Sequence, residues 1–157
     1  MLLRPRQKEL VSKTVDALYT HGNTLAVAPT GAGKTSLAHM LPGLLKPTKG
    51  KITIDGKNIS EISLRSLRQR ISYIFQETHL LPDSIFENIR YGNKTASIDE
   101  VEQVARIAGA HNFICELPDG YGTNLGTVLA KLSVGQKQRI SIARGLLKPS
   151  QVLIFDE

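Results

Sequence analysis

The sequence predicts an α/β fold with a mainly parallel β-sheet and a helical insertion. Short apolar segments typical of buried strands alternate with helical segments, which is the pattern of sheets whose strands are joined by helices. A glycine-rich turn follows the first of these strands, and two acidic residues follow the last. The 157 residues, 41% of them hydrophobic and 22% charged, suit one globular domain spanning residues 1–157.

The first half of the chain is predicted to alternate between the two element types. Apolar residues recur at helical spacing before Gly22, and Pro47 with Gly50 closes the helix that starts at Lys34. Asp55-Gly56 is a turn pair after a strand. The expected elements are helices at 11–19, 34–45 and 63–68 and strands at 24–28, 51–54 and 71–75.

The second half is predicted to be mostly helical. Residues 82–117 follow a helical pattern, and Ser97 with Glu100 forms a capping-box pattern within it. Glycine and proline make 118–126 a loop. A helix at 133–147 and a buried strand at 152–155 complete the chain. Residues 82–132 are therefore a predicted helical insertion into a core formed by 41–81 and 133–157.

Charge and cysteine content restrict the function classes. Residues 1–40 hold five Lys/Arg and two Asp/Glu (+3), and the rest hold fifteen and twelve (+3), so the net charge of +6 is spread out. This favours a solvated surface over a nucleic-acid-binding face. The single Cys115 excludes an internal disulfide and favours a reducing compartment. Its apolar neighbours predict a buried structural thiol, although a nucleophile remains the alternative.

Membrane insertion is not predicted from the sequence. No apolar run is long enough to cross a bilayer, and the N-terminal residues 1–6 contain no apolar segment typical of a signal peptide. A membrane role would therefore require a partner.

A phosphate-binding loop is predicted at Ala28-Pro-Thr-Gly-Ala-Gly-Lys-Thr35, between a strand and a helix. The two glycines let successive backbone N–H groups face one centre, to which the helix N-terminus adds partial positive charge. Lys34 can reach the β and γ phosphates, and the Thr35 hydroxyl can bind Mg²⁺. An ordinary glycine-rich turn is the alternative. The predicted nucleotide contacts are Thr30, Gly31, Ala32, Gly33, Lys34, Thr35 and Ser36.

The acidic pair Asp156-Glu157 follows four apolar residues. Alone this pattern is weak, because many strands end that way, but the upstream phosphate loop strengthens it. Its resemblance to the second nucleotide motif of P-loop ATPases implies that Asp156 holds Mg²⁺, and that Glu157 polarises the attacking water as general base.

Leu132-Ser133-Val134-Gly135-Gln136 begins the predicted helix at 133–147 with a second capping-box pattern. Gly135 leaves the backbone open to a ligand; a merely capped helix is the alternative. The longer string from Leu132 to Leu147 resembles the signature region of ABC transporter ATPases. That resemblance implies that Ser133, Gly135 and Gln136 bind the γ-phosphate of ATP held by an opposite subunit.

The resemblance covers residues 41–157. Ser72–Glu77 is similar to the family's glutamine loop, which implies that Gln76 contacts Mg²⁺ and the attacking water. The segments 45–56 and 83–92 resemble the exporter branch, which moves drugs, lipids or peptides outward. The resemblance implies a P-loop NTPase core, Mg²⁺ and ATP as cofactors, and catalytic roles for Lys34, Gln76 and Glu157.

The same resemblance implies partners and a location. The chain is expected to pair head to tail as a homodimer or with a second ATPase subunit. It is also expected to contact a transmembrane transporter domain and to lie on the cytoplasmic side, at the inner face of the membrane.

Residues 1–40 resemble superfamily-2 helicases instead. Those proteins begin their phosphate loop with alanine, as Ala28 does here, and read adenine with a glutamine placed like Gln7. An amide can pair with the donor and acceptor edge of adenine, although a solvated Gln7 is the alternative. A join between Gly31 and Leu41 predicts a chimera, engineered or formed by recombination.

Two departures from the exporter pattern affect the prediction. Residues 126–132 lack the Glu-Gly-rich segment through which exporters couple to membrane partners. The chain ends at Glu157, so the core is expected to be truncated at its C-terminus, without the central strand that follows the acidic pair in both families. Strands 24–28 and 152–155 must then pair directly or leave a hole.

The sequence is consistent with three functions. The first is an ATP-hydrolysing nucleotide-binding domain that couples hydrolysis to export. The second is a helicase-like, nucleic-acid-dependent ATPase, suggested by residues 1–40. The third is a non-catalytic P-loop chimera that only binds nucleotide, suggested by the missing strand.

Overall fold

The computed structural model describes residues 24–28, 38–54 and 57–156. The predicted helix at 11–19, the turn pair Asp55-Gly56, most of the phosphate loop and Glu157 lie outside these ranges. The described chain forms two compact units, which are treated separately. The strand unit comprises residues 24–76 and 150–156, and the helical unit comprises residues 77–149.

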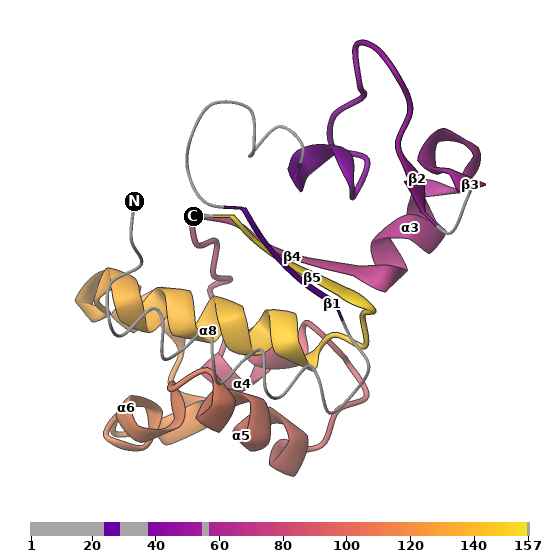
Figure 1. Ribbon diagram of the computed structural model, residues 1–157. Coiled ribbons are helices and arrows are strands. Elements are labelled where there is room, and N and C mark those ends of the chain that lie inside the picture. Colours follow the sequence, from indigo (N-terminus) through magenta and orange to yellow (C-terminus); the bar gives the residue numbers. More distant parts are fainter. Residues whose placement is uncertain (1–23, 29–37, 55–56, 157) are drawn as a thin grey trace. The chain divides into compact units, whose positions relative to one another are not determined.

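The strand unit is built on a parallel three-stranded sheet (Figure 1). Its order is β1 (Thr24–Ala28), β5 (Val152–Asp156) and β4 (Ile71–Ile74), with β5 in the centre. Parallel pairing joins β5 to both neighbours. The sequence left open whether the first and last strands pair directly or enclose a hole. They pair directly, so β5 occupies the centre with both of its edges hydrogen-bonded.

One apolar cluster forms the core of the strand unit. Its buried members come from β4, β5, the helix α3 (Leu64–Arg70) and neighbouring turns. Ser63 caps α3 by accepting a hydrogen bond from Ser66 N, and the predicted basic helix is confirmed with two more residues at its end. Two short antiparallel strands, β2 (Thr53–Ile54) and β3 (Lys57–Asn58), precede η1 (Ile59–Glu61). The buried cluster members are Ala38, Ile59, Leu67, Ile71 and Ile154.

The helix after the phosphate loop ends earlier than predicted. Its described part is helical at residues 38–40 and continues as turns, whereas the prediction extended it to Leu45. Pro42 explains the difference, because proline disfavours helical backbone in the residue before it. Gly43 then takes a positive φ of 69°, and its N–H donates to Met40 O at 3.0 Å. This hydrogen-bonded reversal ends the helix before the Pro47 and Gly50 stop signals.

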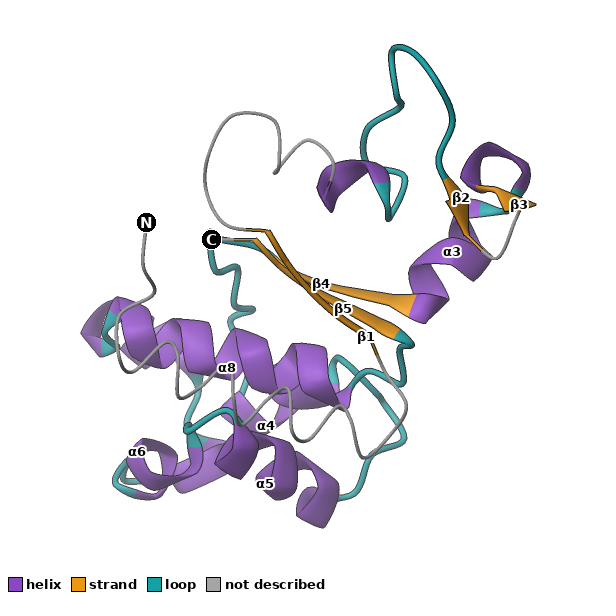
Figure 2. Ribbon diagram, in the orientation of Figure 1, coloured by secondary structure: helices purple, strands orange, loops and turns teal. Residues whose placement is uncertain are grey.

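The helical unit packs α8 (Val134–Leu147) against α4 (Ile85–Arg90) and α5 (Ile98–Ile107), as Figure 2 shows. The predicted helical stretch 82–117 is thus confirmed as α4, α5 and α6 (His111–Cys115), separated by turns. Both bonds of the capping box at the start of α5 are present: Ser97 N donates to Glu100 at 2.7 Å, and Glu100 N donates to Ser97 Oγ at 3.3 Å.

The predicted loop at 118–126 is wrong in part. It contains the 3-10 turn η2 (Gly120–Gly122) and the start of α7 (Leu125–Val128), which is followed by η3 (Leu129–Lys131). Asn124 caps α7 by accepting from Gly126 N at 2.8 Å, and Leu125 is fully buried. The burial of Leu125 favours the helical turn α7. The glycine and proline content of residues 118–126 does not predict that turn.

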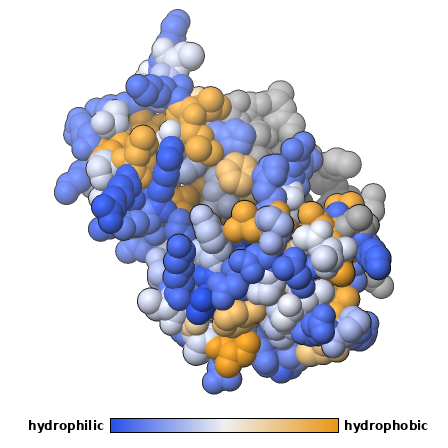
Figure 3. Space-filling view, turned by 180° about the vertical axis from the view of Figure 1, so that it is seen from behind, coloured by the Kyte–Doolittle hydropathy of each residue, from blue (hydrophilic) through white to orange (hydrophobic). Residues whose placement is uncertain are grey.

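Helix α8 belongs to the helical unit. The contacts of α8 with α4 and α5 account for this grouping. The predicted division of the chain into a core at 41–81 and 133–157 and an insertion at 82–132 stays a prediction. The described surface is mixed: on the face in Figure 3, hydrophobic residues form separate patches among hydrophilic ones. No helix in the described ranges is long and apolar enough to cross a membrane.

Candidate functional site

The carboxyl ends of the three parallel strands meet at one edge of the sheet in the strand unit. The register places Ala28 opposite Asp156, and Ile74 of β4 opposite Phe155. The phosphate loop starts at Ala28, and Gln76 follows β4 by two residues. Ligands of α/β sheets bind outside the carboxyl ends of the strands. The sheet therefore brings three separate predicted motifs to the edge where a nucleotide would bind.

The structure describes part of the predicted residue set. Gln76 is exposed, and the backbone of Asp156 ends β5. Residues predicted to contact the nucleotide or to act in catalysis also lie outside the described ranges: Gln7, Thr30, Gly31, Ala32, Gly33, Lys34, Thr35, Ser36 and Glu157. Their roles stay predictions.

The described residues include the backbone of a position predicted to bind Mg²⁺ at the carboxyl edge of the sheet, Asp156 at the end of β5. Within the ranges that the structure describes, no three His, Cys, Asp or Glu residues gather to hold a metal ion. Mg²⁺ is usually held by one or two protein oxygen ligands together with substrate phosphates and water. The backbone register places Asp156 opposite Ala28, where the predicted phosphate loop starts.

Aromatic side chains contact one another at the end of β4, just before Gln76. The rings of Tyr73 and Phe75 lie 4.5 Å apart between centroids, and His39 lies 5.4 Å from Tyr73. Aromatic contacts of this kind stabilise packing beyond the area they bury. These ring contacts lie directly before Gln76 in the chain, and the sequence alone does not predict them.

The predicted signature segment forms the exposed start of α8 in the helical unit. Ser133 Oγ accepts from Gln136 N at 3.2 Å, and Gln136 Oε1 accepts from Ser133 N at 2.8 Å, so the capping box is confirmed. Val134 is 80% exposed. Outside its own helical turn, a Cβ added to Gly135 would meet no atom of the described residues within 4 Å. The described part of the chain thus gives no steric reason for glycine there, which suits a backbone kept open for an outside ligand.

Replacing Ser133 with alanine is expected to lower the free energy of unfolding by about 1 kcal/mol, because the cap of α8 is lost. Urea denaturation followed by circular dichroism measures this change. Ser141, in the middle of the same helix, gives the matched control: Ser141→Ala is expected to change stability by less than about 0.5 kcal/mol. Equal losses in the two variants would contradict the capping role.

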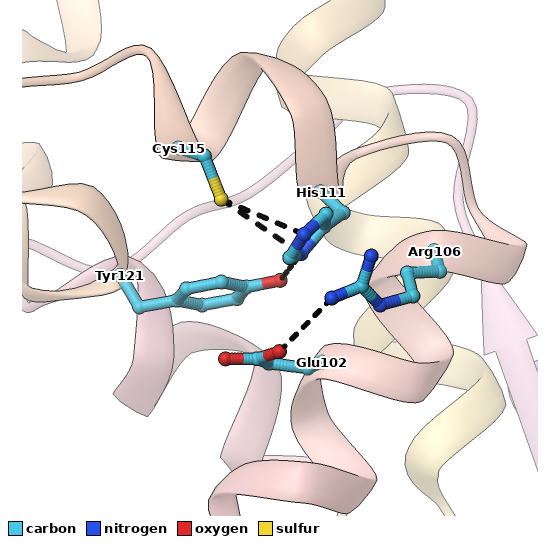
Figure 4. A network of polar contacts seen from close by, with 5 residues as sticks. All are labelled: Glu102, Arg106, His111, Cys115 and Tyr121. Atoms are coloured by element: carbon cyan, nitrogen blue, oxygen red, sulfur yellow. Dashed lines mark hydrogen bonds and ion pairs between the residues drawn. The ribbon is translucent and has the colours of Figure 1, made fainter.

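Polar side chains from α5, α6 and η2, none of them a predicted nucleotide contact, lie close together (Figure 4). His111 Nδ1 lies 2.9 Å from Tyr121 Oη, Cys115 Sγ lies 3.6 Å from His111 Nε2, and Glu102 pairs with Arg106 at 3.3 Å. Burial, and then the Glu102 carboxylate, raises the pKa of Tyr121 to about 12. The phenol therefore stays protonated at neutral pH.

The structure corrects the prediction that Cys115 is buried. The thiol is exposed, because the short helix α6 buries Phe113 and Ile114 and turns Cys115 to its other side. Phe113 and Ile114 are therefore buried, whereas Cys115, which directly follows them, is exposed. Cys115 lies outside the predicted nucleotide site.

Comparison with known proteins agrees with this arrangement. A family model described as ABC transporter matches residues 14–157. The uncharacterized ABC transporter ATP-binding protein y4gM of Sinorhizobium fredii is 41% identical over 150 residues, covering 95% of this chain and 26% of that protein. The ATP-dependent lipid A-core flippase of Syntrophus aciditrophicus is 43% identical over 148 residues, covering 94% of this chain and 25% of that protein.

A solved structure shows the same fold. The structure of a bacterial Atm1-family ABC exporter with ATP bound superposes with a TM-score of 0.77 at 42% identity, covering 87% of this chain and 24% of that one. The chain thus spans about a quarter of the length of these relatives. The alignment with a flippase and an exporter supports the exporter type predicted from residues 45–56 and 83–92. On the matched residues, the sheet topology and the superposition, the chain belongs to the ABC transporter family.

Proposed function

We propose that this chain binds Mg²⁺-ATP through the loop 28–35 and hydrolyses it as the nucleotide-binding part of an exporter. The observation that carries the proposal is the register of the sheet. It sets the start of the phosphate loop opposite Asp156, and the exit to Gln76 beside the end of β5. Family membership and the ATP-bound exporter of the same fold support the choice of nucleotide.

Each predicted residue has a distinct task in this proposal. The backbone N–H groups of Thr30–Ser36 hold the phosphates, and Lys34 neutralises the β and γ phosphate charge. Thr35 and Asp156 would supply oxygen ligands to Mg²⁺, and Gln76 would contact the ion and the water that attacks the γ-phosphate. Glu157 would accept a proton from that water as general base. When bound, Mg²⁺-ATP supplies the transferable phosphoryl group and the cation that balances its charge.

The proposal includes partners. Two ATPase chains pair head to tail, so that Ser133, Gly135 and Gln136 of one reach the γ-phosphate held by the other. The exposed helix start and the open space at Gly135 support this role. A transmembrane domain would place the ATPase at the cytoplasmic face of the membrane. Relatives named as a flippase and an exporter support an export role, and they are about four times the length of this chain.

The helicase-like resemblance of residues 1–40 contributes one finer proposal, that Gln7 reads the adenine base. Its support is the resemblance alone, because Gln7 lies outside the described residues. A chimeric origin also stays a prediction. The matched relatives extend over 94% or 95% of this chain at 41% to 43% identity, so they align with much of that segment as well.

Lys34→Ala tests nucleotide binding. We expect the Kd for Mg²⁺-ATP to rise at least about tenfold, because a charge-assisted bond to phosphate contributes about 1.5–3 kcal/mol. Titration calorimetry measures the Kd, and Lys131→Ala, on an exposed residue of the helical unit, is the matched control. The same titration with GTP tests whether the site prefers adenine.

The outcomes separate the three candidate functions. Binding that depends on Lys34, together with turnover, supports the ATPase. Binding without turnover supports the non-catalytic alternative, and turnover stimulated by DNA or RNA supports the helicase-like one. If wild type and Lys34→Ala bind Mg²⁺-ATP equally, the proposed site is wrong.

A further inference from the structure

Asn88 organises the segment that follows Gln76. Its side chain is fully buried in the helical unit. The two hydrogens of Asn88 Nδ2 are directed at three carbonyl oxygens, so one N–H is shared: Leu81 O at 3.0 Å, Asp83 O at 3.3 Å and Ser84 O at 2.9 Å. Asn88 Oδ1 accepts from Leu81 N at 2.8 Å. One side chain thus fixes the path of residues 81–84.

Arg144 reaches the same segment from α8. Its Nε donates to Asn88 O at 2.7 Å, its Nη2 to Asn88 Oδ1 at 2.7 Å, and its Nη1 to His79 O at 2.8 Å. All three bonds cross at least 56 positions of sequence. Desolvation by burial lowers the pKa of Arg144, but an arginine keeps its charge at neutral pH. The planar guanidinium therefore forms a fork between α8 and the segment 79–88.

Close backbone contact supports this arrangement independently. A Cβ built on Gly92, just after α4, would overlap the backbone carbonyl of Arg144. The end of α4 therefore lies against α8 at the residue that carries the fork. This close contact between the two backbones requires glycine at position 92. Arg144 therefore both packs against the end of α4 and carries the hydrogen bonds of the fork.

The residues joined by the fork lie near the two points where the chain passes between the strand unit and the helical unit. The chain passes from the strand unit to the helical unit between Gln76 and Glu77, and returns between Pro149 and Ser150. His79 lies three residues after the first crossing, and Arg144 five residues before the end of the helical unit. Within the helical unit, the fork thus joins the two chain segments that lead to the strands.

We propose that Arg144 is a positioning residue that ties the segment following Gln76 to the helix that begins at Ser133. A displacement of either element is then passed to the other through the guanidinium. This inference rests on the proposed function, because the reaction it would serve is ATP hydrolysis. Arg144 would contact neither the nucleotide nor the attacking water, and would act through the segment 79–88, which follows Gln76 in the chain, and through α8.

Two substitutions isolate the fork. Arg144→Met keeps an unbranched apolar stem and removes every donor, whereas Arg144→Lys keeps the charge but cannot make the three-bond fork. Arg139→Met is the matched control: it lies on the same helix and makes one bond of 3.3 Å to Gly109 O. Thermal unfolding of each variant shows whether it remains folded.

The first readout is hydrogen exchange, which needs no nucleotide. The amides of Leu81 and Asp83 report on the segment, because they donate to Asn88 Oδ1 and Leu81 O. We expect Arg144→Met to speed their exchange at least about tenfold, with Arg144→Lys in between and the α5 amides unchanged. Equal exchange at Leu81 in Arg144→Met and Arg139→Met would overturn the proposed tether.

The second readout is the ATPase reaction, with kcat expressed per bound nucleotide so that unfolded protein does not count. We expect Arg144→Met to lower kcat about tenfold and to leave KM for ATP within about twofold, because the phosphate loop starts in the strand unit. Arg144→Lys should recover part of kcat. A merely structural role predicts unchanged kcat per bound ATP, and that result would overturn the positioning role. If wild type neither binds nor hydrolyses ATP, the proposed function fails, and the exchange rates alone decide the tether.

Discussion

Replacing Glu157 with glutamine is expected to lower kcat for ATP by about 10²- to 10⁴-fold, the usual contribution of a general base. Glutamine has nearly the same shape but cannot accept the proton of the attacking water. The Kd for Mg²⁺-ATP should change little, because the phosphates are held by the loop 28–35. Steady-state phosphate release and nucleotide titration measure the two quantities.

The same variant tests the head-to-tail pair. With hydrolysis blocked, Mg²⁺-ATP should accumulate the closed dimer, which analytical ultracentrifugation detects as a doubling of mass. Glu116→Gln, on an exposed residue of the helical unit, is the matched control and should keep wild-type turnover. A Glu157→Gln chain that binds Mg²⁺-ATP and stays monomeric would contradict the head-to-tail arrangement.

Replacing Asn88 with alanine is expected to lower the free energy of unfolding by about 3–4 kcal/mol. The change removes the hydrogen bonds that the Asn88 amide makes with the backbone of residues 81–84 and leaves Arg144 Nη2 without Asn88 Oδ1. Buried polar groups that lose their partners cost more than the bonds themselves contributed. Urea denaturation measures the loss.

Asn112→Ala provides the comparison for that loss. Asn112 is exposed on α6, so its removal should change stability by less than about 0.5 kcal/mol. Asn88→Asp is a finer variant: it keeps the acceptor for Arg144 and loses the donors to Leu81, Asp83 and Ser84. If Asn88→Ala is no less stable than Asn112→Ala, the buried network does not hold the segment.

Local signals predicted many of the elements correctly. Helix α8 begins at the capping box of Ser133 and Gln136, and α5 at that of Ser97 and Glu100, as expected. Strands β1, β4 and β5 match their apolar runs to within one residue. Caps and apolar runs depend on residues close in sequence, which is why the sequence shows them directly.

Two of the predictions that differ from the structure are the end of one helix and the burial of one cysteine. The helix expected to reach Leu45 ends after Met40, because Pro42 acts before Pro47 and Gly50. Cys115 was expected to be buried with its apolar neighbours, but α6 turns it outward. The rotation of a five-residue helix depends on which side the rest of the unit covers, and the neighbouring sequence does not carry that information.

The sequence by itself determined the motifs, their order and the family resemblance: a phosphate loop at 28–35, a glutamine at 76, a capped signature helix at 133 and an acidic pair at 156–157. Tertiary structure alone decided how distant parts meet. It pairs β5 directly with β1, which brings Asp156 opposite Ala28. It also brings Arg144 into hydrogen-bond contact with Asn88, 56 positions away in the sequence. Both depend on contacts between segments far apart in the chain, because hydrogen-bond partners and buried neighbours are chosen only when the chain packs.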